Sequence, residues 1–532
     1  MSDQAASSSE AAVERPTSAA EADPVRATPY AYYALALLVL ANIFNYIDRQ
    51  IVSIAAQGLK ADLGLTDSEL GFLLGTAFAV FYGVVGIAMG RIADSLSRTR
   101  LLTVGISLWS AMTTLSGFAG GFAGLASARL GVGIGEAVAN PCAHSLLSQY
   151  FPPRNRSAVL ATYNLGPHLG GALALAGGGL LLQHWGTICQ ALPGQACHLA
   201  NWRAVFLIVG APGLILAVLM ALLREPARRL PPRRRSVAGL IGHEMSAAVP
   251  PFTFFNLFQI GGAGAVVGNL VFAAVLALAA MGLIALTGDW PQWAAVAVGV
   301  YSVVTWAGVL QRRDPPLYAL TFGCTTFRLV AAGSALTNCV LGAAQAWSPT
   351  YMIRVLGASP GETGLKLGVT GAITAGLSVV LGGLVCDWWK RYDPRAPVWI
   401  VLIGLVTPIP AFLFMLHAKD VPAFVTAYAA FMFLAMTWAG GIGAMVQDLV
   451  LTRMRGTASA SFSLVLILVG SSIGPYWAGK ISTLTGSLTT GLYSILALAP
   501  IAAVLLVMGA RRLGKDTLEA RLARARAAGE DI

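Results

Sequence analysis

The chain has 532 residues, of which 56% are hydrophobic and 11% are charged, and its mean hydropathy is +0.70. This composition provides too little polar surface to cover a water-soluble globule of this size, so it indicates a membrane protein. The net charge of +11 does not indicate a nucleic-acid partner, because the Arg and Lys residues lie in short loops between long apolar runs. These runs are long enough to cross a bilayer as helices, and the short alternating strands of a barrel do not occur. We therefore expect an all-α polytopic membrane protein.

The chain begins with a polar tail that is followed by a helical half. Residues 1–30 are rich in Ser, Ala, Glu and Pro and lack the basic start and early apolar core of a signal peptide, so we expect a disordered tail. Residues 31–223 are expected to form a bundle of six membrane-spanning helices. The apolar runs lie near residues 31–54, 69–90, 101–121, 122–147, 157–183 and 203–223.

The rest of the chain is expected to contain a second half of the same kind and an additional pair of helices. Residues 224–322 should hold a basic cytoplasmic linker followed by a hairpin of two spans, near 264–287 and 292–310. Residues 323–510 should form the second six-helix bundle, and residues 511–532 a basic cytoplasmic tail. About fourteen spans result, those of the second bundle lying near 323–352, 364–386, 397–416, 420–446, 459–481 and 489–510.

The distribution of basic residues among the loops predicts the orientation, because cytoplasmic loops carry an excess of Arg and Lys. Alternate loops hold most of these residues, including Arg312 and Arg313 after the hairpin. The other loops hold Lys60, Arg354, Lys419 and little else. We therefore expect a multi-pass protein of the cell membrane (inner or plasma membrane) with both termini on the cytoplasmic side.

An internal repeat with a constant offset of 293 residues relates the two halves. Shared Gly and Leu content would give a few accidental matches, but it would not also reproduce an Asp and an Arg. Two pseudo-symmetric halves, related as the parallel repeats of many secondary transporters are, are therefore expected. The repeated residues are Leu63, Gly64, Glu69, Gly71, Leu74, Gly75, Ala79, Gly83, Gly90, Asp94 and Arg98, which recur as Leu356, Gly357, Glu362, Gly364, Leu367, Gly368, Ala372, Gly376, Gly383, Asp387 and Arg391.

The last part of the repeat places a Gly, an Asp and an Arg where a span leaves the membrane on the cytoplasmic side. The glycine would allow close approach of helices, while the Asp and Arg could pair with each other, with a helix end or with a neighbouring loop. Contacts made in one conformation and broken in another would form a conformational switch, and the alternative is ordinary interfacial charge. The six residues are Gly90, Asp94, Arg98, Gly383, Asp387 and Arg391.

Polar and ionisable residues interrupt the expected first and fourth spans. Such residues cost several kcal/mol inside a membrane and usually face a wet cavity, where they pair with one another. At helical spacing the residues of each span share a face or lie next to it. The set comprises Asn42, Asn45, Tyr46, Asp48 and Arg49 in the first span and Arg129, Glu136, Asn140 and His144 in the fourth.

The expected depth of these charges follows from a helical rise of about 1.5 Å per residue. Asp48 and Arg129 should lie at comparable heights in the outer half of the membrane, and Glu136 nearer the midplane. We expect Asp48 and Glu136 to couple proton movement to transport, because breaking an ion pair shifts the proton affinity of a buried carboxylate. The alternative is a static pair that fixes two helices together. The expected ion-pair or substrate residues are Arg49, Arg129, Asn45 and Asn140.

The second half lacks a comparable charge. No counterpart of Glu136 occurs in the span 420–446, so coupling is assigned to the first half. Asn338, Gln345 and Trp347 could contribute to a substrate cavity or pack between helices.

The six cysteines include no CxxC and no Cys/His cluster with zinc spacing, so neither a metal nor another cofactor is expected. Cys189 and Cys197 share one expected outer loop, where they either form a disulfide or remain free. The others are expected to be packing residues, namely Cys142, Cys324, Cys339 and Cys386.

The repeated Gly-Asp-Arg element resembles the G-x-x-x-D-(R/K)-x-G-(R/K)-(R/K) signature of the major facilitator superfamily. Ser95 and Ser97 stand where Arg and Gly are usual. Residues 166–171 (GPHLGG) are similar to the G-P-x-x-G-G element of the same superfamily, which is often seen in antiporters. The resemblance covers both halves and implies a twelve-helix transporter fold, from which the extra hairpin departs.

Two further segments resemble one branch of that superfamily, the Spinster-type transporters. They are residues 45–49 (NYIDR) and residues 131–137 (GVGIGEA), the latter followed by Asn140 and Pro141. The resemblance implies functional roles for Asp48, Arg49, Arg129 and Glu136. Members of the branch are associated with export of sphingolipids or lysophospholipids, whose phosphate a central Arg could bind.

We therefore expect a proton-coupled secondary active transporter of amphipathic lipid-like substrates, such as lysolipids or sphingolipids, that works by alternating access as a monomer among membrane lipids. The alternative is a proton-coupled exporter of multiple drugs or organic cations from the same superfamily. An enzyme with catalytic residues is not expected, because the sequence contains no HExxH, no GxSxG and no paired His/Asp cluster.

Overall fold

The computed structural model describes residues 27–191, 196–226, 236–246, 249 and 252–530. Over these ranges the chain forms helices and turns without a β-strand. Thirteen of the helical segments described are long and apolar enough to cross a membrane, which confirms the expected all-α membrane fold. Most of the expected N-terminal tail lies outside the described residues, and α1 begins at Pro29, where the Thr28 side chain accepts a hydrogen bond from the Ala31 backbone N–H.

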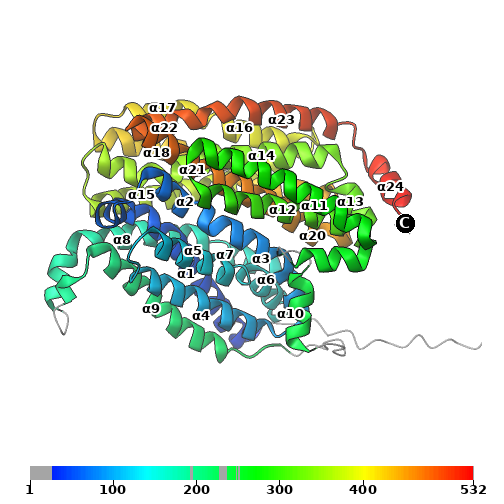
Figure 1. Ribbon diagram of the computed structural model, residues 1–532, viewed down its shortest axis with the longest axis horizontal. Coiled ribbons are helices and arrows are strands. Elements are labelled where there is room, and N and C mark those ends of the chain that lie inside the picture. The colour runs from blue at the N-terminus through cyan, green and yellow to red at the C-terminus, as the bar shows by residue number, and fades with distance from the viewer. Residues whose placement is uncertain (1–26, 192–195, 227–235, 247–248, 250–251, 531–532) are drawn as a thin grey trace, which may run out of the picture.

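The first half is the lower bundle in Figure 1. Three of its expected spans contain a break, between α2 and α3, between α5 and α6, and between α7 and α8. The second break directly follows Glu136, so that this carboxylate lies at a helix end. The elements are α1 (Pro29–Leu63), α2 (Asp67–Leu74), α3 (Thr76–Ser95), α4 (Arg98–Ser116), α5 (Phe122–Glu136), α6 (Ala139–Tyr150), α7 (Pro153–Tyr163), α8 (Gly166–Ala191), η1 (Ala196–His198) and α9 (Asn201–Ala221).

The linker helix, the extra hairpin and the second half follow. The hairpin consists of α11 and α12, and a π-helical turn, η4, interrupts the second half near its end. The elements are α10 (Val237–Met245), α11 (Thr253–Thr287), α12 (Trp290–Arg313), α13 (Pro315–Leu320), α14 (Thr325–Arg354), α15 (Pro360–Lys390), α16 (Ala396–Val406), α17 (Pro408–His417), α18 (Val421–Ala435), η2 (Met436–Trp438), α19 (Ala439–Asp448), η3 (Thr452–Met454), α20 (Arg455–Val465), η4 (Leu466–Ser471), α21 (Ser472–Thr485), α22 (Leu488–Ser494), η5 (Ile495–Ala497), α23 (Leu498–Leu513) and α24 (Leu518–Ala527).

One expected span is not among the thirteen apolar segments. This span, near 101–121, corresponds to α4, whose 19 residues begin with Arg98 and Arg100 and contain several Ser and Thr. This less apolar helix packs against α5 and α9 (Figure 1).

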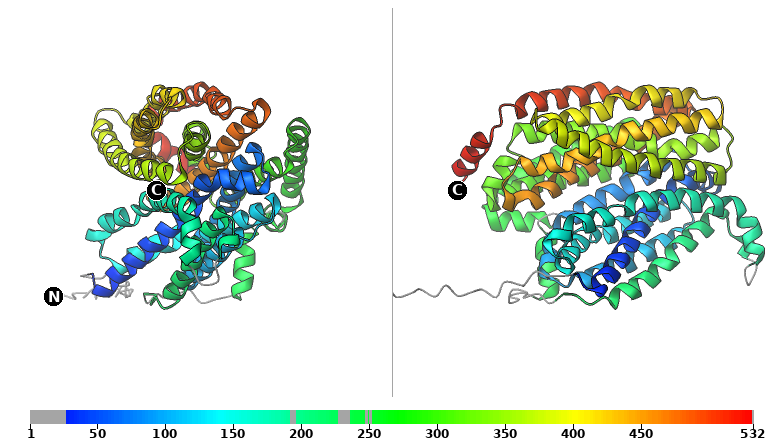
Figure 2. Two further views of the ribbon diagram at one scale, coloured as in Figure 1. Left: turned by 90° about the vertical axis from the view of Figure 1, so that its left-hand side faces the viewer. Right: turned by 180° about the vertical axis from the view of Figure 1, so that it is seen from behind.

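The two halves meet through two equivalent helix pairs, α8 with α15 and α2 with α21. The 293-residue offset converts α2 into α15, and it converts residues of α8 into residues of α21. The Ser53 hydroxyl also donates to the carbonyl of Ala346, which lies 293 residues further along the chain. Equivalent positions can touch only near the pseudo-twofold axis, so this contact places the axis between α1 and α14. Figure 2 shows the two bundles on either side of it.

Glycines at equivalent positions bring these helices together. A Cβ on Gly71 would lie 2.5 Å from the carbonyl oxygen of Pro475, and a Cβ on Gly364 would lie 2.0 Å from that of Leu175. Because the obstructing atoms belong to the main chain, neither position accepts a side chain without separating the helices. Close contact between the halves therefore depends on residues that the repeat had already paired in the sequence.

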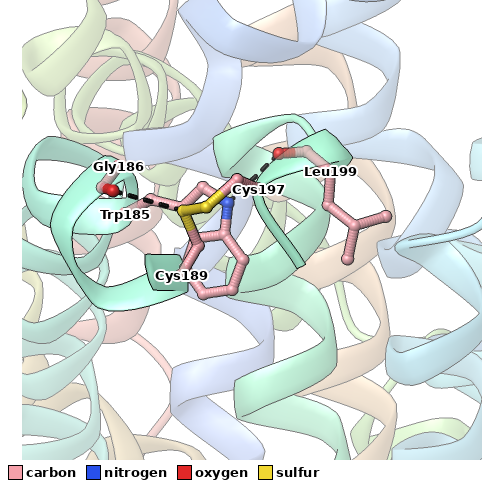
Figure 3. The surroundings of a disulfide bond; sticks show 5 residues. All are labelled: Trp185, Gly186, Cys189, Cys197 and Leu199. Carbon is pink, nitrogen blue, oxygen red and sulfur yellow. Dashed lines mark hydrogen bonds between the residues drawn. A yellow bond between two sulfur atoms is a disulfide. The ribbon is translucent and has the colours of Figure 1, made fainter. Parts of the chain in front are cut away.

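The expected outer loop between α8 and α9 contains a disulfide bond between Cys189 and Cys197 (Figure 3). Beside it, the Trp185 indole N–H donates to the carbonyl of Leu199 at 3.1 Å. The four other cysteines are buried, as expected of packing residues. The disulfide therefore links η1 covalently to the end of α8.

Candidate functional site

The glycines before Glu136 let α5 pack closely between two neighbouring helices. A Cβ on Gly133 would lie 2.7 Å from the carbonyl oxygen of Phe78 in α3, and a Cβ on Gly135 would lie 2.8 Å from the backbone nitrogen of Trp109 in α4. Because α5 is in contact with main chain on both sides, it cannot rotate freely. This packing directs the side chain of Glu136 toward α1.

Glu136 forms an ion pair with Arg49 inside the first half. Arg49 Nε donates to Glu136 Oε2 at 2.6 Å, and Glu136 is 0% exposed whereas the Arg49 side chain is 19% exposed. The second carboxylate oxygen, Oε1, has no hydrogen-bond partner. A fully buried carboxylate with one unoccupied acceptor can take up a proton without losing another hydrogen bond.

Three aromatic rings surround the guanidinium of Arg49. Its Cζ lies 4.7 Å from the ring centre of Tyr46, 4.5 Å from that of Phe78 and 4.6 Å from that of Tyr82. Cation–π contacts of this kind stabilise a charge that is partly removed from water. The guanidinium therefore retains favourable contacts even if the pair with Glu136 is broken.

Arg129 contacts the main chain of Asp48 and not its carboxylate. Arg129 Nη1 donates to the backbone carbonyl of Asp48 at 2.8 Å, while Asp48 Oδ1 and Arg129 Nε lack hydrogen-bond partners. Both residues are almost completely buried. Successive residues of a helix point about 100° apart, so α1 presents Arg49 to Glu136 but only its backbone to Arg129.

The expected polar residues near this pair have separate roles. Asn140 connects two tyrosines, since its amide donates to the Tyr82 hydroxyl at 3.3 Å and its carbonyl accepts from the Tyr163 hydroxyl at 3.0 Å. Asn45 is buried, and its Nδ2 has no partner. Asn140 therefore positions the ring of Tyr82, which contacts Arg49. Both of its hydrogen-bond partners are uncharged hydroxyl groups.

A cavity of about 240 Å³ lies between the two halves. Tyr46, Gln50 and His168 line it from the first half, and Gln345 and Tyr428 from the second, together with apolar residues of α8, α15 and α18. None of the expected proton-coupling or ion-pair residues reaches its surface. Tyr46 connects the two regions, because it lines the cavity and also contacts the guanidinium of Arg49.

The glycine-rich element of α8 shapes one wall of this cavity. Cβ atoms on Gly166 and Gly170 would lie 2.8 Å from Asn42 Nδ2 and 2.5 Å from the carbonyl oxygen of Ile43. α8 therefore lies directly against α1, and His168 is carried to the cavity with its Nδ1 unpaired. Sequence reasoning did not select His168 as a site residue, although the GPHLGG motif contains it.

Of Asn338, Gln345 and Trp347, one residue lines the cavity and two pack between helices. Gln345 lines the cavity. The Asn338 amide donates to Ser471 at 3.1 Å, and the Trp347 indole donates to the carbonyl of Pro475 at 2.9 Å. Asn338 and Trp347 therefore pack against η4 and α21, respectively. Tyr428 of the second half, which no sequence pattern singled out, also lines the cavity.

The expected conformational switch is arranged asymmetrically. A Cβ on Gly90 would meet no atom within 4 Å, so the expected close helix approach does not occur there, whereas Gly383 lies against Gly440 of α19, where a Cβ on Gly440 would lie 2.6 Å from the Gly383 backbone nitrogen. The side chain of Asp94 lies outside the described part of the structure, while Arg98 is buried and its backbone N–H donates to Glu225 at 3.0 Å.

In the second copy, Asp387 and Arg391 are both exposed. Among the described side chains, the ion pairs of this loop join Lys390 to Asp448 and Arg395 to Asp393, and neither involves Asp387 or Arg391. Of the three contacts expected for this motif, the pairing of Asp387 with Arg391 therefore does not occur here, where both side chains are exposed.

Comparisons with known proteins give a consistent result. A sequence model of the Major Facilitator Superfamily matches residues 38–475. An MFS-type efflux pump of Mycolicibacterium smegmatis is 29% identical over 459 residues, which are 85% of this chain and 84% of that protein. Protein spinster of Drosophila melanogaster is 24% identical over 464 residues, which are 85% of this chain and 62% of that protein.

A solved structure has the same fold. It is the crystal structure of a bacterial homolog of the human lysosomal transporter Spinster in an inward-facing and occupied conformation, with a TM-score of 0.68 and 22% identity. The match covers 92% of this chain and 98% of that chain. The expected resemblance to Spinster-type proteins is thereby confirmed.

Proposed function

The chain belongs to the Major Facilitator Superfamily, and from this premise we propose that it is a proton-coupled secondary transporter of amphipathic lipid-like molecules, such as lysolipids or sphingolipids. The observation that carries the proposal is the buried pair of Arg49 and Glu136, joined through the ring of Tyr46 to the cavity between the halves. Alternating access of this cavity to the two sides of the membrane is the proposed mechanism.

In this mechanism, protonation of Glu136 weakens its attraction for Arg49. A neutral carboxyl group holds a guanidinium far less strongly than a carboxylate does, so Arg49 is left to its aromatic neighbours. Tyr46 contacts both the guanidinium and the cavity, so a shift of Arg49 alters the cavity wall. Proton uptake and substrate binding are thereby coupled in the first half alone.

The composition of the cavity supports the proposed substrate class. Leu175, Leu367, Met432 and Met436 offer apolar surface for an acyl chain, and methionines adapt to irregular chains. The amides and hydroxyls around them offer hydrogen bonds to a polar head. A substrate with one apolar and one polar end matches these two kinds of wall.

The proposed orientation places both termini on the cytoplasmic side of the cell membrane, and the transporter is proposed to act as a monomer. Cysteines introduced at Lys419 and Lys515 test the orientation. A membrane-impermeant thiol reagent added to intact cells should label Lys419→Cys and leave Lys515→Cys unlabelled. Labelling in the opposite pattern would invert the proposed topology.

The decisive experiment uses purified protein in proteoliposomes with and without a pH gradient. Uptake of a lysophospholipid, a sphingoid base and a cationic dye is compared for the wild type, Glu136→Gln and Glu362→Gln. Glu362 is a suitable control because it pairs with Lys366 on its own helix, away from the cavity. The proposal requires that Glu136→Gln lose the response to the gradient while Glu362→Gln keeps it.

The second candidate is a proton-coupled exporter of drugs or organic cations. The similarity to an efflux pump over most of both chains favours it. The same panel distinguishes the two, because vigorous transport of the dye without transport of either lipid would establish this candidate in place of the first.

A further inference from the structure

The extra hairpin lies in the seam between the halves. Its second helix, α12, packs along α3 of the first half and also contacts η4 of the second half. Its first helix, α11, is almost entirely on the outside, as Figure 1 and Figure 2 show in green. The hairpin is therefore part of the interface between the halves, since α12 contacts both of them.

The contacts of α12 with both halves occur at two levels within the seam. At mid-length, a Cβ on Gly299 would lie 2.8 Å from Leu468 of η4 and 3.6 Å from Val80 of α3. Further along, the Trp306 indole donates to Ser461 of α20 at 3.3 Å, and its ring lies 5.5 Å from the guanidinium carbon of Arg91.

The tip of the hairpin makes the strongest of these bridges. Asp289 Oδ2 accepts hydrogen bonds from the hydroxyls of Ser68 in α2 and Tyr476 in α21, each at 2.8 Å, and the ammonium of Lys480 lies at the same distance. One carboxylate oxygen thus holds both walls of the α2–α21 contact.

Gln292, three residues beyond Asp289, makes a second polar contact with the first half. Gln292 is buried, and its Oε1 lies 2.7 Å from the Thr76 hydroxyl of α3, which in turn lies 2.8 Å from the carbonyl of Ser472 in α21. Among the described residues, the hydrogen bond of Gln292 therefore reaches the first half only, through Thr76, and Asp289 is the residue of the hairpin tip that contacts both halves.

A separate tie joins the halves at the same end. Asp67 accepts two hydrogen bonds from Arg354 of α14, at 2.6 and 2.8 Å, and one from Ser482 of α21 at 2.6 Å. Lys60 of its own half also donates to it at 2.7 Å. We call the end of the molecule that holds Asp67 and Asp289 the tied end.

We propose that the hairpin is a third gating element, which clamps the tied end shut through Asp289 and must release one half before that end can open. This inference rests on the alternating access of the proposed function. Opening separates α2 from α21, and a single carboxylate oxygen cannot then keep Ser68 on one side and Lys480 on the other. The hairpin thus adds a bridge that a transporter of two bundles alone would lack.

The test measures the opening of the tied end directly. Spin labels on cysteines at Ala61 and Lys419, which are exposed and lie in different halves at this end, report the distance between the halves in liposomes by double electron–electron resonance. The four free cysteines are buried and remain outside the labelling reaction. Measurements are made with and without a lysophospholipid and at two pH values.

Asp289→Asn should increase the ratio of open to closed molecules by about fivefold, which is the effect expected of a partly exposed charged bridge. Lys480→Gln should act in the same direction, and the exchanged pair Asp289→Lys with Lys480→Asp should restore much of the closed population. Asp420→Asn is the matched control, because Asp420 caps α18 at this end without touching the first half. Its distance distribution should equal that of the wild type.

The outcomes separate the clamp from the proposed function. If the wild type responds to substrate or pH and both Asp289→Asn and Lys480→Gln leave the distances unchanged, the clamp is refuted while alternating access stands. If the wild type shows one unchanging distance under all conditions, the proposed function itself fails. A monodisperse elution profile of each variant establishes that the protein is folded.

Discussion

Arg49 of α1 and Glu136 of α5 lie 2.6 Å apart within the first half, with the carboxylate completely buried and the guanidinium partly exposed. Removal of one member of such a pair leaves an uncompensated charge, whereas removal of both does not. The stability of variants of this pair can therefore separate the contribution of its charges from the contribution of its packing.

Arg49→Met should destabilise the folded protein by about 3 to 5 kcal/mol at neutral pH, because it leaves the buried carboxylate of Glu136 without its cation. The double variant Arg49→Met with Glu136→Gln should recover most of this loss. The midpoints of thermal unfolding in detergent measure both effects. A double variant no more stable than Arg49→Met would mean that the rings around Arg49, and not the charge pair, determine the loss.

Gly364→Ala should weaken the contact between α15 and α8, since its Cβ would lie 2.0 Å from a main-chain oxygen. The expected cost is about 1 to 3 kcal/mol, as for other overpacked positions. Gly376→Ala on the same helix is the control, because nothing lies within 4 Å of its Cβ. Unfolding midpoints of the two variants should differ clearly, and equal midpoints would contradict a tight α8–α15 interface.

His168→Gln should raise the KM for a transported lysolipid by about tenfold, the effect of losing one useful polar contact, while the response to a pH gradient remains. The reason is that His168 lines the cavity but lies apart from the pair of Arg49 and Glu136. Initial transport rates at several substrate concentrations provide the measurement. Loss of gradient dependence in this variant would transfer proton coupling to the histidine.

Asp67→Asn should open the tied end more than Asp289→Asn does. Asp67 is buried and accepts from Arg354 twice, so its replacement breaks a charge-assisted bidentate contact, which is stronger than the single contacts at the hairpin tip. The spin-label distances across the tied end measure the difference. A smaller shift than that of Asp289→Asn would make the hairpin the dominant tie.

The clamp at Asp289 should be insensitive to pH between 5 and 8. Partial burial raises the pKa of Asp289, but hydrogen bonds from Lys480, Ser68 and Tyr476 together lower it below its ordinary value. A lowered pKa means that the stabilising charge is present above about pH 4 and is lost only as the pH falls through the pKa of the folded state. The ratio of open to closed molecules in Asp289→Asn relative to wild type should therefore be constant across this range. A ratio that varies with pH would indicate that another titrating group controls the clamp.

Much of the fold followed from local properties of the chain. Apolar runs long enough to cross a bilayer predict helices regardless of their neighbours, and the 293-residue repeat predicts two halves because it compares the chain only with itself. The same repeat contained Gly71 and Gly364, the residues that bring the halves into contact, although their role was not evident from spacing. The breaks within spans were not predicted, since they depend on which helices lie alongside.

By itself the sequence determined that the chain is a two-half helical membrane protein with its buried charges in the first half, because hydropathy, helical period and internal repetition are properties of neighbouring residues. Only the tertiary structure decided that Glu136 binds Arg49, that Arg129 reaches a backbone carbonyl of α1, and that Asp289 bridges the halves. Those choices depend on how far each helix is rotated and how closely it approaches partners tens to hundreds of residues away. Residue spacing along one helix contains no information about that rotation.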